Sequence, residues 1–221
     1  MIDLHTHTFM SDGTLPPSEV IRRAALAGYE AVALTDHVDA ANLEAVISAL
    51  IRVCQVANRH GAIYAIPGVE ITYVPPPFIA ETAAAARRLG AQIVVVHGET
   101  LTEPVEEGTN RAAIEAGVEI LAHPGLISDE DAALAAARGV ALEITTRRGH
   151  AYTNGHVAVL ARRFGARIVI DNDAHTPGDI LSQAFSDRIA RGAGLTPAEL
   201  AAARGNSREL VARIRRRTGS E

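Results

Sequence analysis

Lysine is absent from this chain of 221 residues, so the 21 Lys and Arg positions are all arginines. That absence excludes catalysis through a lysine Schiff base. Cysteine occurs once, at Cys54, which excludes an internal disulfide and is typical of a reducing compartment. Because Cys54 lies in the apolar helical stretch AVISALIRVCQVA, we expect a buried, unreactive thiol.

Long apolar runs are also missing. No stretch approaches the length of a membrane span, and the opening residues MIDLHTHT lack the apolar core of a signal peptide. We therefore expect a cytoplasmic protein with no membrane partner. The formal net charge of -5 argues against a general affinity for nucleic acid, because the phosphate backbone attracts basic surfaces.

Short runs of Val, Ile and Leu alternate with longer alanine-rich helical patterns, as expected of βα units around a parallel sheet. Strands are predicted at residues 2–5, 31–35, 63–71, 92–96, 119–122, 141–144 and 167–170. Helices are predicted at residues 17–26, 43–59, 79–89, 109–116, 129–137 and 155–164. A glycine follows each helical run, where a left-handed residue commonly ends a helix: Gly28, Gly61, Gly90, Gly117, Gly139 and Gly165.

The hydrophobic fraction of 48% is enough for one buried core, and a barrel of this length is commonly a single domain. We expect one domain over residues 1–221, with the barrel in 1–191 and a helical cap in 192–221. The cap sequence GLTPAELAAARGNSRELVARIRRR predicts two short helices. Their expected N-caps are Thr196 for the first and Asn206 or Ser207 for the second.

Ionisable residues follow almost every predicted strand, at the strand ends where barrel active sites form. Six of the nine histidines lie at such ends: His5, His7, His37, His97, His123 and His175. In extended backbone His5 and His7 project from one face, close enough to share a metal. Mixed histidine and carboxylate ligands favour Zn²⁺, Mn²⁺ or Fe²⁺ over Ca²⁺ or Mg²⁺. The number of ligands exceeds the need of one ion, so we expect a multinuclear site.

The motifs HTHTFMSDG, ALTDH, GVEI, VVHGE, AHPG and DNDAH occur in this order between Ile2 and His175. In this respect the chain resembles the PHP family, the polymerase and histidinol phosphatase domain superfamily. The resemblance implies an α/β fold, a distorted (β/α)7 TIM-like barrel. It also implies a metal-dependent phosphoesterase with two or three divalent ions, Zn, Mn or Fe.

Carried over position by position, the resemblance implies three metal positions. His5, His7, Glu70 and Asp173 would hold one ion, and Glu70 would bridge to a second ion held by His97 and His123. Asp12, His37 and His175 would hold a third, whose occupancy is less certain because relatives differ at the Asp12 position. We prefer Asp173 to its rival Asp171, because D-x-H places Asp173 on the same face as His175. Asp36 is expected to orient a neighbouring histidine rather than to bind metal.

Two arginines, Arg147 and Arg148, follow the strand at 141–144 and lie at the same mouth. Either guanidinium could bind a substrate phosphate with paired hydrogen bonds, and the alternative is an exposed salt bridge. We hold the two interpretations equal for at least one of them. The predicted catalytic residues are therefore Glu70, Asp12, Arg147 and Arg148.

Other polar residues have a structural and a functional interpretation. Tyr152, Asn154 and His156 could line the pocket, but a turn with an N-cap at Asn154 is slightly favoured. His60 is interpreted as structural, because it ends a helix where the dipole favours a cation. His150 is left open, and Glu99 is a candidate partner of a ligand. Solvated surfaces are the favoured interpretation of Glu103, Glu106 and Glu107, and of Arg213, Arg215, Arg216 and Arg217.

We therefore predict hydrolysis of a small phosphomonoester by a metal-activated hydroxide, as in histidinol phosphatases, with a small phosphorylated substrate as partner. The alternative is a phosphodiesterase or exonuclease acting on nucleotides or short oligonucleotides. A second alternative is a catalytically silent, metal-stabilised module, which filled ligand positions disfavour. Hydrolysis at carbon through a bridging modified lysine is excluded because the chain has no lysine.

Overall fold

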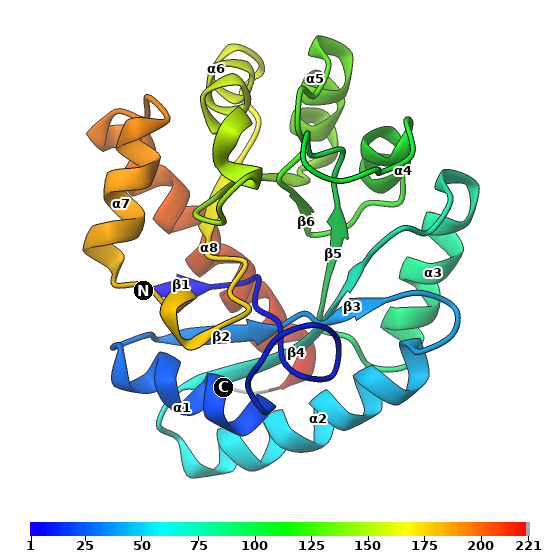
Figure 1. Ribbon diagram of the computed structural model, residues 1–221, viewed down its shortest axis with the longest axis vertical. Coiled ribbons are helices and arrows are strands. Elements are labelled where there is room, and N and C mark those ends of the chain that lie inside the picture. Colours follow the sequence, from blue (N-terminus) through cyan, green and yellow to red (C-terminus); the bar gives the residue numbers. More distant parts are fainter. Residues whose placement is uncertain (220–221) are drawn as a thin grey trace.

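The computed structural model describes residues 1–219 as an α/β barrel of parallel strands surrounded by helices (Figure 1). The strands are β1 (Ile2–Asp3), β2 (Ala31–Leu34), β3 (His37–Val38), β4 (Tyr64–Ile71), β5 (Ile93–His97), β6 (Ile120–Ala122), β7 (Ala141–Thr145) and β8 (Ile168–Asp171). The helices are α1 (Pro17–Leu26), α2 (Leu43–His60), α3 (Pro76–Arg88), α4 (Thr109–Glu115), α5 (Asp129–Arg138), α6 (Asn154–Phe164), α7 (Gln183–Gly192) and α8 (Pro197–Thr218), with short 3-10 helices at His150–Thr153 and Pro177–Asp179.

Seven strands form the barrel in the order β1-β2-β4-β5-β6-β7-β8, and every pairing along this path is parallel. The expected seven-stranded barrel is thereby confirmed. All predicted strands and helices before residue 170 are present, with bounds that differ by at most three residues. The sequence pattern missed β3, a two-residue strand that pairs with β4 beside the barrel path.

The barrel is nearly closed, and its seam lies between β1 and β8. One parallel bridge joins Thr6 to Ala174, and the His7 N–H donates to the Ala174 carbonyl at 2.8 Å. Lower on the seam, the Leu4 N–H donates to the Asp171 carboxylate at 2.7 Å, so a side chain takes the place of a strand partner. The first and last strands are thus joined partly through a buried acid.

Two apolar layers hold the barrel together. The outer layer lies between the strands and α1 to α6, where Cys54 is buried and desolvation raises its pKa to about 12. The expected inert thiol therefore has a physical basis. The inner layer fills the barrel with side chains such as Leu4, Ile66 and Val95, and α8 adds Leu210, Val211 and Ile214 to it.

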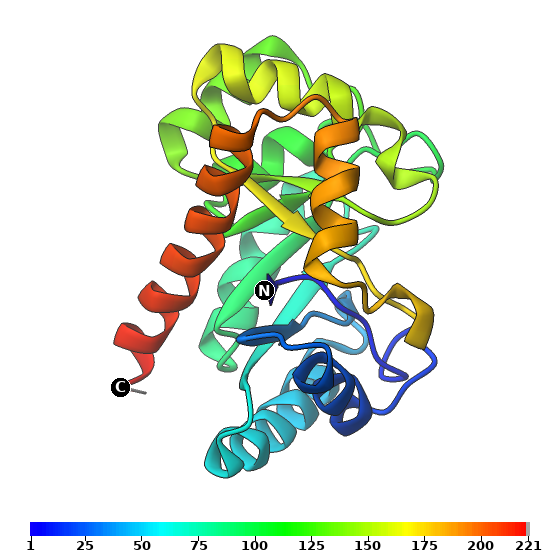
Figure 2. The ribbon, with the colours of Figure 1, turned by 90° about the vertical axis from the view of Figure 1, so that its left-hand side faces the viewer.

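The predicted pair of short helices near the C-terminus is wrong: α8 runs unbroken from Pro197 to Thr218 (Figure 2). Thr196 does cap it, accepting from the Glu199 N–H in a capping box. Asn206 and Ser207 lie in the helix interior instead, where Asn206 donates to the Ile168 carbonyl and Ser207 to the Ala203 carbonyl. Packing of the apolar face under the barrel overrides the local tendency to break. Helix α7, capped by Ser182, was not predicted.

Among residues 1–219, no helix has both the length and the apolar character required to cross a membrane. The division into a barrel at 1–191 and a cap at 192–221 stays a prediction.

Candidate metal centre

The carboxyl ends of the strands converge on a cavity of about 280 Å³ at one mouth of the barrel. Parallel strands direct their C-terminal residues to the same end, so segments distant in sequence meet there. The residues that line this cavity are mostly ionisable: Asp12, His37, Thr72, Tyr73, His97, Glu103, Arg147, His150, Asp173 and His175.

The first group of ligand-type atoms lies at the inner end of the cavity. The Nε2 atoms of His5 and His7 are 3.0 Å apart, as expected for two side chains on one face of an extended segment. Asp173 Oδ1 lies 3.1 Å from His7 Nε2, and Glu70 Oε1 lies 3.2 Å from His5 Nε2. The structure therefore brings together all four residues expected at the first metal position.

Glu70 occupies the centre of the cluster. It is fully buried on β4, and its oxygens lie within 4 Å of four histidines from three segments: His5, His7, His37 and His123. Burial raises the pKa of Glu70, but the adjacent His5 and His37 outweigh it and hold that pKa well below its ordinary value. Neither carboxylate oxygen has a hydrogen-bond partner among the residues described. The ionised Glu70 carboxylate is thus stabilised by adjacent positive charge, which a bound metal ion would also supply.

A second group comprises three buried histidines, His97, His123 and His150, whose ligand atoms all lie within 4.8 Å of one another. His123 Nε2 is 3.7 Å from both Glu70 Oε1 and Asp173 Oδ2, which links this group to the first. The sequence indicated His97 and His123 here and left His150 open.

A third group is formed by His7, Asp12, His37 and His175, nearer to solvent. Asp12 Oδ1 lies 3.2 Å from His175 Nε2 and 3.5 Å from His37 Nε2, and the Asp12 side chain is 57% exposed. Burial raises the Asp12 pKa, but hydrogen bonding to His175 and the charge of His37 outweigh it and hold that pKa far below its ordinary value. Asp12 is therefore an anion at the cavity entrance.

Several histidine rings are oriented through their Nδ1 atoms. His5 Nδ1 lies 2.9 Å from Glu143 Oε1, His97 Nδ1 donates to the Gly98 carbonyl, and His175 Nδ1 donates to the Asp173 carbonyl. These contacts leave the Nε2 atoms facing the cluster. Hydrogen bonds of this kind to the second ring nitrogen fix the tautomer and orientation of metal-binding histidines.

The backbone is also unusual at this mouth. Three non-glycine residues of the described chain have positive φ: Tyr73 at 54°, His123 at 26° and Asp173 at 51°. Two of them are expected ligands, and the third lines the same cavity. Such conformations cost about 1–3 kcal/mol each and persist where the surroundings hold the residue in place. Here they aim side chains into the cluster.

The donor set fits divalent cations. Burial and the nearby His37 lower the pKa of His7 to about 3, and burial together with His97 lowers that of His123 well below its ordinary value. Neutral imidazoles thus lie beside the ionised Glu70 and Asp173. Four of the buried side-chain atoms that lack a hydrogen-bond partner in residues 1–219 belong to this cluster: His7 Nδ1, both Glu70 oxygens and His123 Nδ1. A bound ion would satisfy the Glu70 oxygens.

The two arginines at the mouth differ in position. Arg147 lines the cavity and lies 3.6 Å from Asp179 Oδ2, with 30% of its side chain exposed. Arg148 is exposed and is not part of the cavity lining that the structure describes. The positions therefore favour Arg147 as the substrate-facing arginine.

Contrary to our expectation, Asp36 does not orient a histidine. Its carboxylate accepts hydrogen bonds from the backbone and hydroxyl groups of Thr8 and Ser11, and so fixes the loop that carries Asp12. Asp171 accepts from the Leu4 N–H at the seam and lies outside the metal groups, in agreement with the preference for Asp173.

Glu99 has a structural role: it accepts from the Gly108 and Asn110 N–H groups at the start of α4. Asn154 hydrogen-bonds both backbone groups of Thr145, but the N-cap of α6 is Thr153, so that detail of the prediction is wrong. His156 lies 2.8 Å from the Ile127 carbonyl, and Tyr152 is 77% exposed. These contacts are structural ones, which supports the favoured interpretation.

Two functional candidates were missed, Glu103 and Glu143, and a third, His150, had been left open. Glu103, interpreted as a solvated side chain, lies 3.1 Å from His97 Nε2 and 3.4 Å from His150 Nε2. Glu143 orients His5 and accepts from the His123 N–H at 3.0 Å. The only sequence signal for Glu143 was its place near the end of β7, whereas Glu103 and His150 lie in loops of irregular length.

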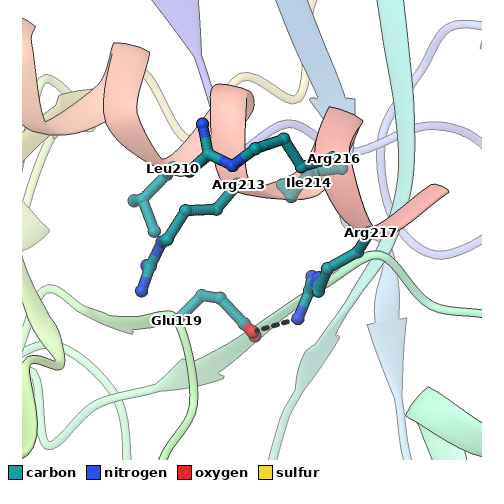
Figure 3. A pocket seen from close by; sticks show the side chains of 6 residues that line it. All are labelled: Glu119, Leu210, Arg213, Ile214, Arg216 and Arg217. Atoms are coloured by element: carbon teal, nitrogen blue, oxygen red, sulfur yellow. Dashed lines mark ion pairs between the residues drawn. The ribbon is translucent and has the colours of Figure 1, made fainter. Parts of the chain in front are cut away.

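Arginines near the C-terminus line a separate pocket, next to Glu119 just before β6 (Figure 3). Arg217 pairs with Glu119 at 3.5 Å, and the Arg215 guanidinium lies 4.4 Å from the centre of the Tyr64 ring. Arg213 and Arg216 line the same pocket. Contacts within the chain thus account for Arg215 and Arg217, as the structural interpretation expected.

Comparisons with known proteins agree with this geometry. The sequence pattern of the PHP domain matches residues 3–162. An uncharacterized protein of Methanocaldococcus jannaschii is 46% identical over 200 residues, which cover 90% of this chain and 92% of that protein.

Two solved structures resemble the fold. One is the histidinol phosphate phosphatase of Lactococcus lactis, in complex with zinc, L-histidinol and phosphate. It has a TM-score of 0.60 at 18% identity, over 88% of this chain and 94% of that one. The other is a putative histidinol phosphatase of Listeria monocytogenes, with a TM-score of 0.62 at 14% identity, over 85% and 99% of the chains. At these identities the likeness concerns the fold alone.

Proposed function

The chain belongs to the PHP domain family, and from that premise we propose that it is a metal-dependent phosphoesterase that hydrolyses a small phosphomonoester. The observation that carries the proposal is Glu70. This fully buried, unpartnered carboxylate lies within 4 Å of four histidines, and histidine–carboxylate groups lie on both sides of it. Such a carboxylate is suited to hold two cations at a fixed separation.

In this proposal His5, His7, Glu70 and Asp173 would hold one ion, while His97 and His123 would hold a second together with Glu70. Asp12, His37 and His175 would hold a third. When bound, the ions neutralise phosphate oxygens and lower the pKa of a water molecule. The Glu143 carboxylate would hold the His5 ring with Nε2 toward its ion, and the Gly98 carbonyl would do the same for His97.

The remaining cavity residues would bind the substrate. The Arg147 guanidinium can donate two hydrogen bonds to phosphate oxygens from its place in the wall. Asp12 stays ionised because its pKa is far below the ordinary value, so it would serve as a ligand rather than as a proton donor to the leaving group.

The size of the cavity supports a small substrate. A volume of about 280 Å³ holds a phosphate and a modest organic group but no duplex. The histidinol complex of the Lactococcus lactis protein makes histidinol phosphate one candidate among several. A phosphodiesterase acting on short oligonucleotides is the second candidate, favoured by the partly exposed mouth at Asp12. A silent module is disfavoured, because a competent side chain stands at every expected ligand position.

The test combines metal analysis by mass spectrometry with hydrolysis of p-nitrophenyl phosphate and bis-p-nitrophenyl phosphate, with and without Mn²⁺. We expect two or three ions per chain and monoester hydrolysis that a chelator abolishes. Diester hydrolysis alone would move the substrate class to oligonucleotides. Protein that binds metal but hydrolyses neither probe nor any of a panel of metabolite phosphates would contradict the proposal.

A further inference from the structure

His150 is a buried histidine beyond the nine ligand positions of the proposed function. It opens the 3-10 helix His150–Thr153 after β7, and only 7% of it is exposed. Its ring stacks on that of His123, with centroids 4.2 Å apart and planes 16° from parallel, and it meets His97 edge-on at 5.7 Å. The three rings therefore form one unit.

The two nitrogens of His150 have different surroundings. Nδ1 lies 2.7 Å from the Thr100 hydroxyl and 3.2 Å from the Thr102 hydroxyl, so the outer side of the ring is fixed. Nε2 faces the cavity and lies 3.4 Å from Glu103 Oε1. A metal-binding histidine shows this division, with one nitrogen hydrogen-bonded and the other free for the ion.

Glu103 joins His150 to His97. Its Oε2 atom lies 3.1 Å from His97 Nε2, and the Tyr73 hydroxyl donates to the same oxygen at 2.7 Å. His97 Nδ1 donates to the Gly98 carbonyl, so Nε2 is the nitrogen that faces Glu103. The two oxygens of Glu103 thus lie beside one ring nitrogen of His97 and one of His150, which adds a carboxylate to the ligand-type groups at this position.

The spacing of the three imidazoles suits one ion. Ligands about 2.0–2.1 Å from a tetrahedral zinc ion are roughly 3.4 Å from one another. The ligand nitrogens of His97, His123 and His150 lie within 4.8 Å of one another, so small shifts of the rings would complete the geometry.

We infer that His150 is a third imidazole ligand of the ion that His97 and His123 hold, and that Glu103 closes this position from the cavity side. The inference rests on the proposed function, because it takes His97 and His123 as metal ligands. It adds a residue that the family pattern did not supply. The second ion thereby has a histidine-rich environment, unlike the carboxylate-rich environment of the first.

A ligand in this loop has a consequence for the substrate site. Arg147 and His150 belong to one short segment, and the Ala151 N–H donates to the Arg147 carbonyl at 3.0 Å. An ion bound by His150 would therefore restrain the segment that places the Arg147 guanidinium in the cavity wall. Metal occupancy and phosphate binding become coupled through this loop.

The deciding measurement is a long-range ¹H–¹⁵N correlation spectrum of histidine-labelled protein, with zinc and after chelation. We expect the His150 Nε2 resonance to move to the metal-bound position when zinc is added. A His150→Phe variant assigns the resonance and keeps an aromatic ring against His123. A second variant, His150→Gln, serves if the first does not fold.

Cobalt provides an independent readout. With Co²⁺ in place of zinc, His150→Phe should change the visible absorption of the second site. It should also weaken the Co²⁺ affinity of that site by more than about 100-fold, which exceeds the usual effect of losing a residue that only hydrogen-bonds to a ligand. His60→Phe, an exposed histidine at the end of α2, is the control and should change neither.

An unchanged His150 resonance on zinc binding, or full cobalt affinity in His150→Phe, would overturn the inference. Phosphatase activity separates it from the proposed function. Phosphate ester hydrolysis by a protein whose His150 does not bind the metal would contradict the inference alone. Metal binding by His150 without hydrolysis of any phosphate ester would contradict the proposed function alone.

Discussion

The two ends of the barrel are built on opposite chemistry. At the carboxyl ends of the strands, buried histidines and carboxylates crowd together, and both Glu70 oxygens lack hydrogen-bond partners in the described residues. At the other end α8 packs Leu210, Val211 and Ile214 into the inner core, and Arg213, Arg216 and Arg217 lie at the surface (Figure 3). One end leaves buried carboxylate oxygens without hydrogen-bond partners in the described residues, and the other end is satisfied by contacts within the chain.

This difference teaches that function and stability are separable along the same strands. Barrel enzymes place catalytic groups at the C-terminal end of the strands, while residues at the opposite end serve stability. The variants below test whether the separation holds.

The largest effect should follow Glu70→Gln. The amide keeps the shape but loses the charge that two cations would share, so we expect a loss of at least about 10³-fold in kcat/KM. Added metal should also raise the unfolding temperature of the native protein far more than that of the variant, since ligands stabilise the state that binds them. Calorimetry and the phosphatase assay measure both.

The control for this variant is Glu107→Gln, the same substitution on an exposed side chain. It should match the native protein in both assays. Full turnover and full metal content in Glu70→Gln would show that Glu70 is not the shared ligand.

Ile214→Ala tests the opposite end. Ile214 is 1% exposed within the inner core, and removing a buried aliphatic side chain of this size costs about 2–5 kcal/mol. Urea unfolding should show that loss, while kcat of the folded variant stays unchanged. Arg208→Ala, on the exposed face of α8, should change stability by less than about 0.5 kcal/mol. A fall in kcat with unchanged stability would break the separation of the two ends.

A smaller effect distinguishes the two arginines at the mouth. Arg147→Ala should lower kcat/KM by about 10- to 100-fold, because it removes a charged donor from the cavity wall. Arg148→Ala, in an exposed position, should stay within about twofold. Equal losses in the two variants would place the phosphate outside the cavity.

The smallest effect concerns the seam between β1 and β8. Burial and the nearby Asp3 raise the pKa of Asp171 well above its ordinary value, and burial raises that of Asp3 to about 7. An acid with a raised folded pKa stabilises the fold fully below its unfolded pKa and loses this contribution as pH rises through the folded pKa. The contribution of Asp3 and Asp171 to stability should therefore decline as the pH rises from the ordinary Asp pKa of 3.8 through their raised pKa values.

Asp171→Asn should flatten this decline, because the amide has no proton to lose. The Asn oxygen can still accept from the Leu4 N–H, as Asp171 does at 2.7 Å. Urea unfolding across this pH range is the measurement. A variant whose stability falls with pH as steeply as the native protein would show that Asp171 is already ionised in the fold.

Sequence reasoning was strongest where periodicity governs structure. The βα alternation and the glycine stops placed the barrel strands, and strand ends then located His5, Glu70 and Asp173 together. Asp173 was preferred to Asp171 from the D-x-H spacing, and the structure places Asp173 beside His7 while Asp171 accepts from the Leu4 N–H.

The rest depends on contacts that no local pattern encodes. Glu103 and His150 lie in loops whose paths are fixed by tertiary contacts, such as the His150 ring on His123. The unbroken α8 is decided by the apolar surface that it covers, against a local Gly205-Asn206 break signal. Asp36 was assigned to a histidine because the loop beside it could not be placed in advance.

The seam also has a consequence for synthesis of the protein on the ribosome. Leu4 and its partner Asp171 are 167 residues apart in the chain. The residues flanking this contact are predicted ligands on either side, with His5 and His7 before the barrel and Asp173 and His175 after it. Chains emerge N-terminus first at about 5–20 residues per second, so His7 precedes Asp173 by about 8 to 33 seconds. The predicted first metal position, which also needs Glu70 and Asp173, can therefore be completed only when nearly the whole barrel has been made.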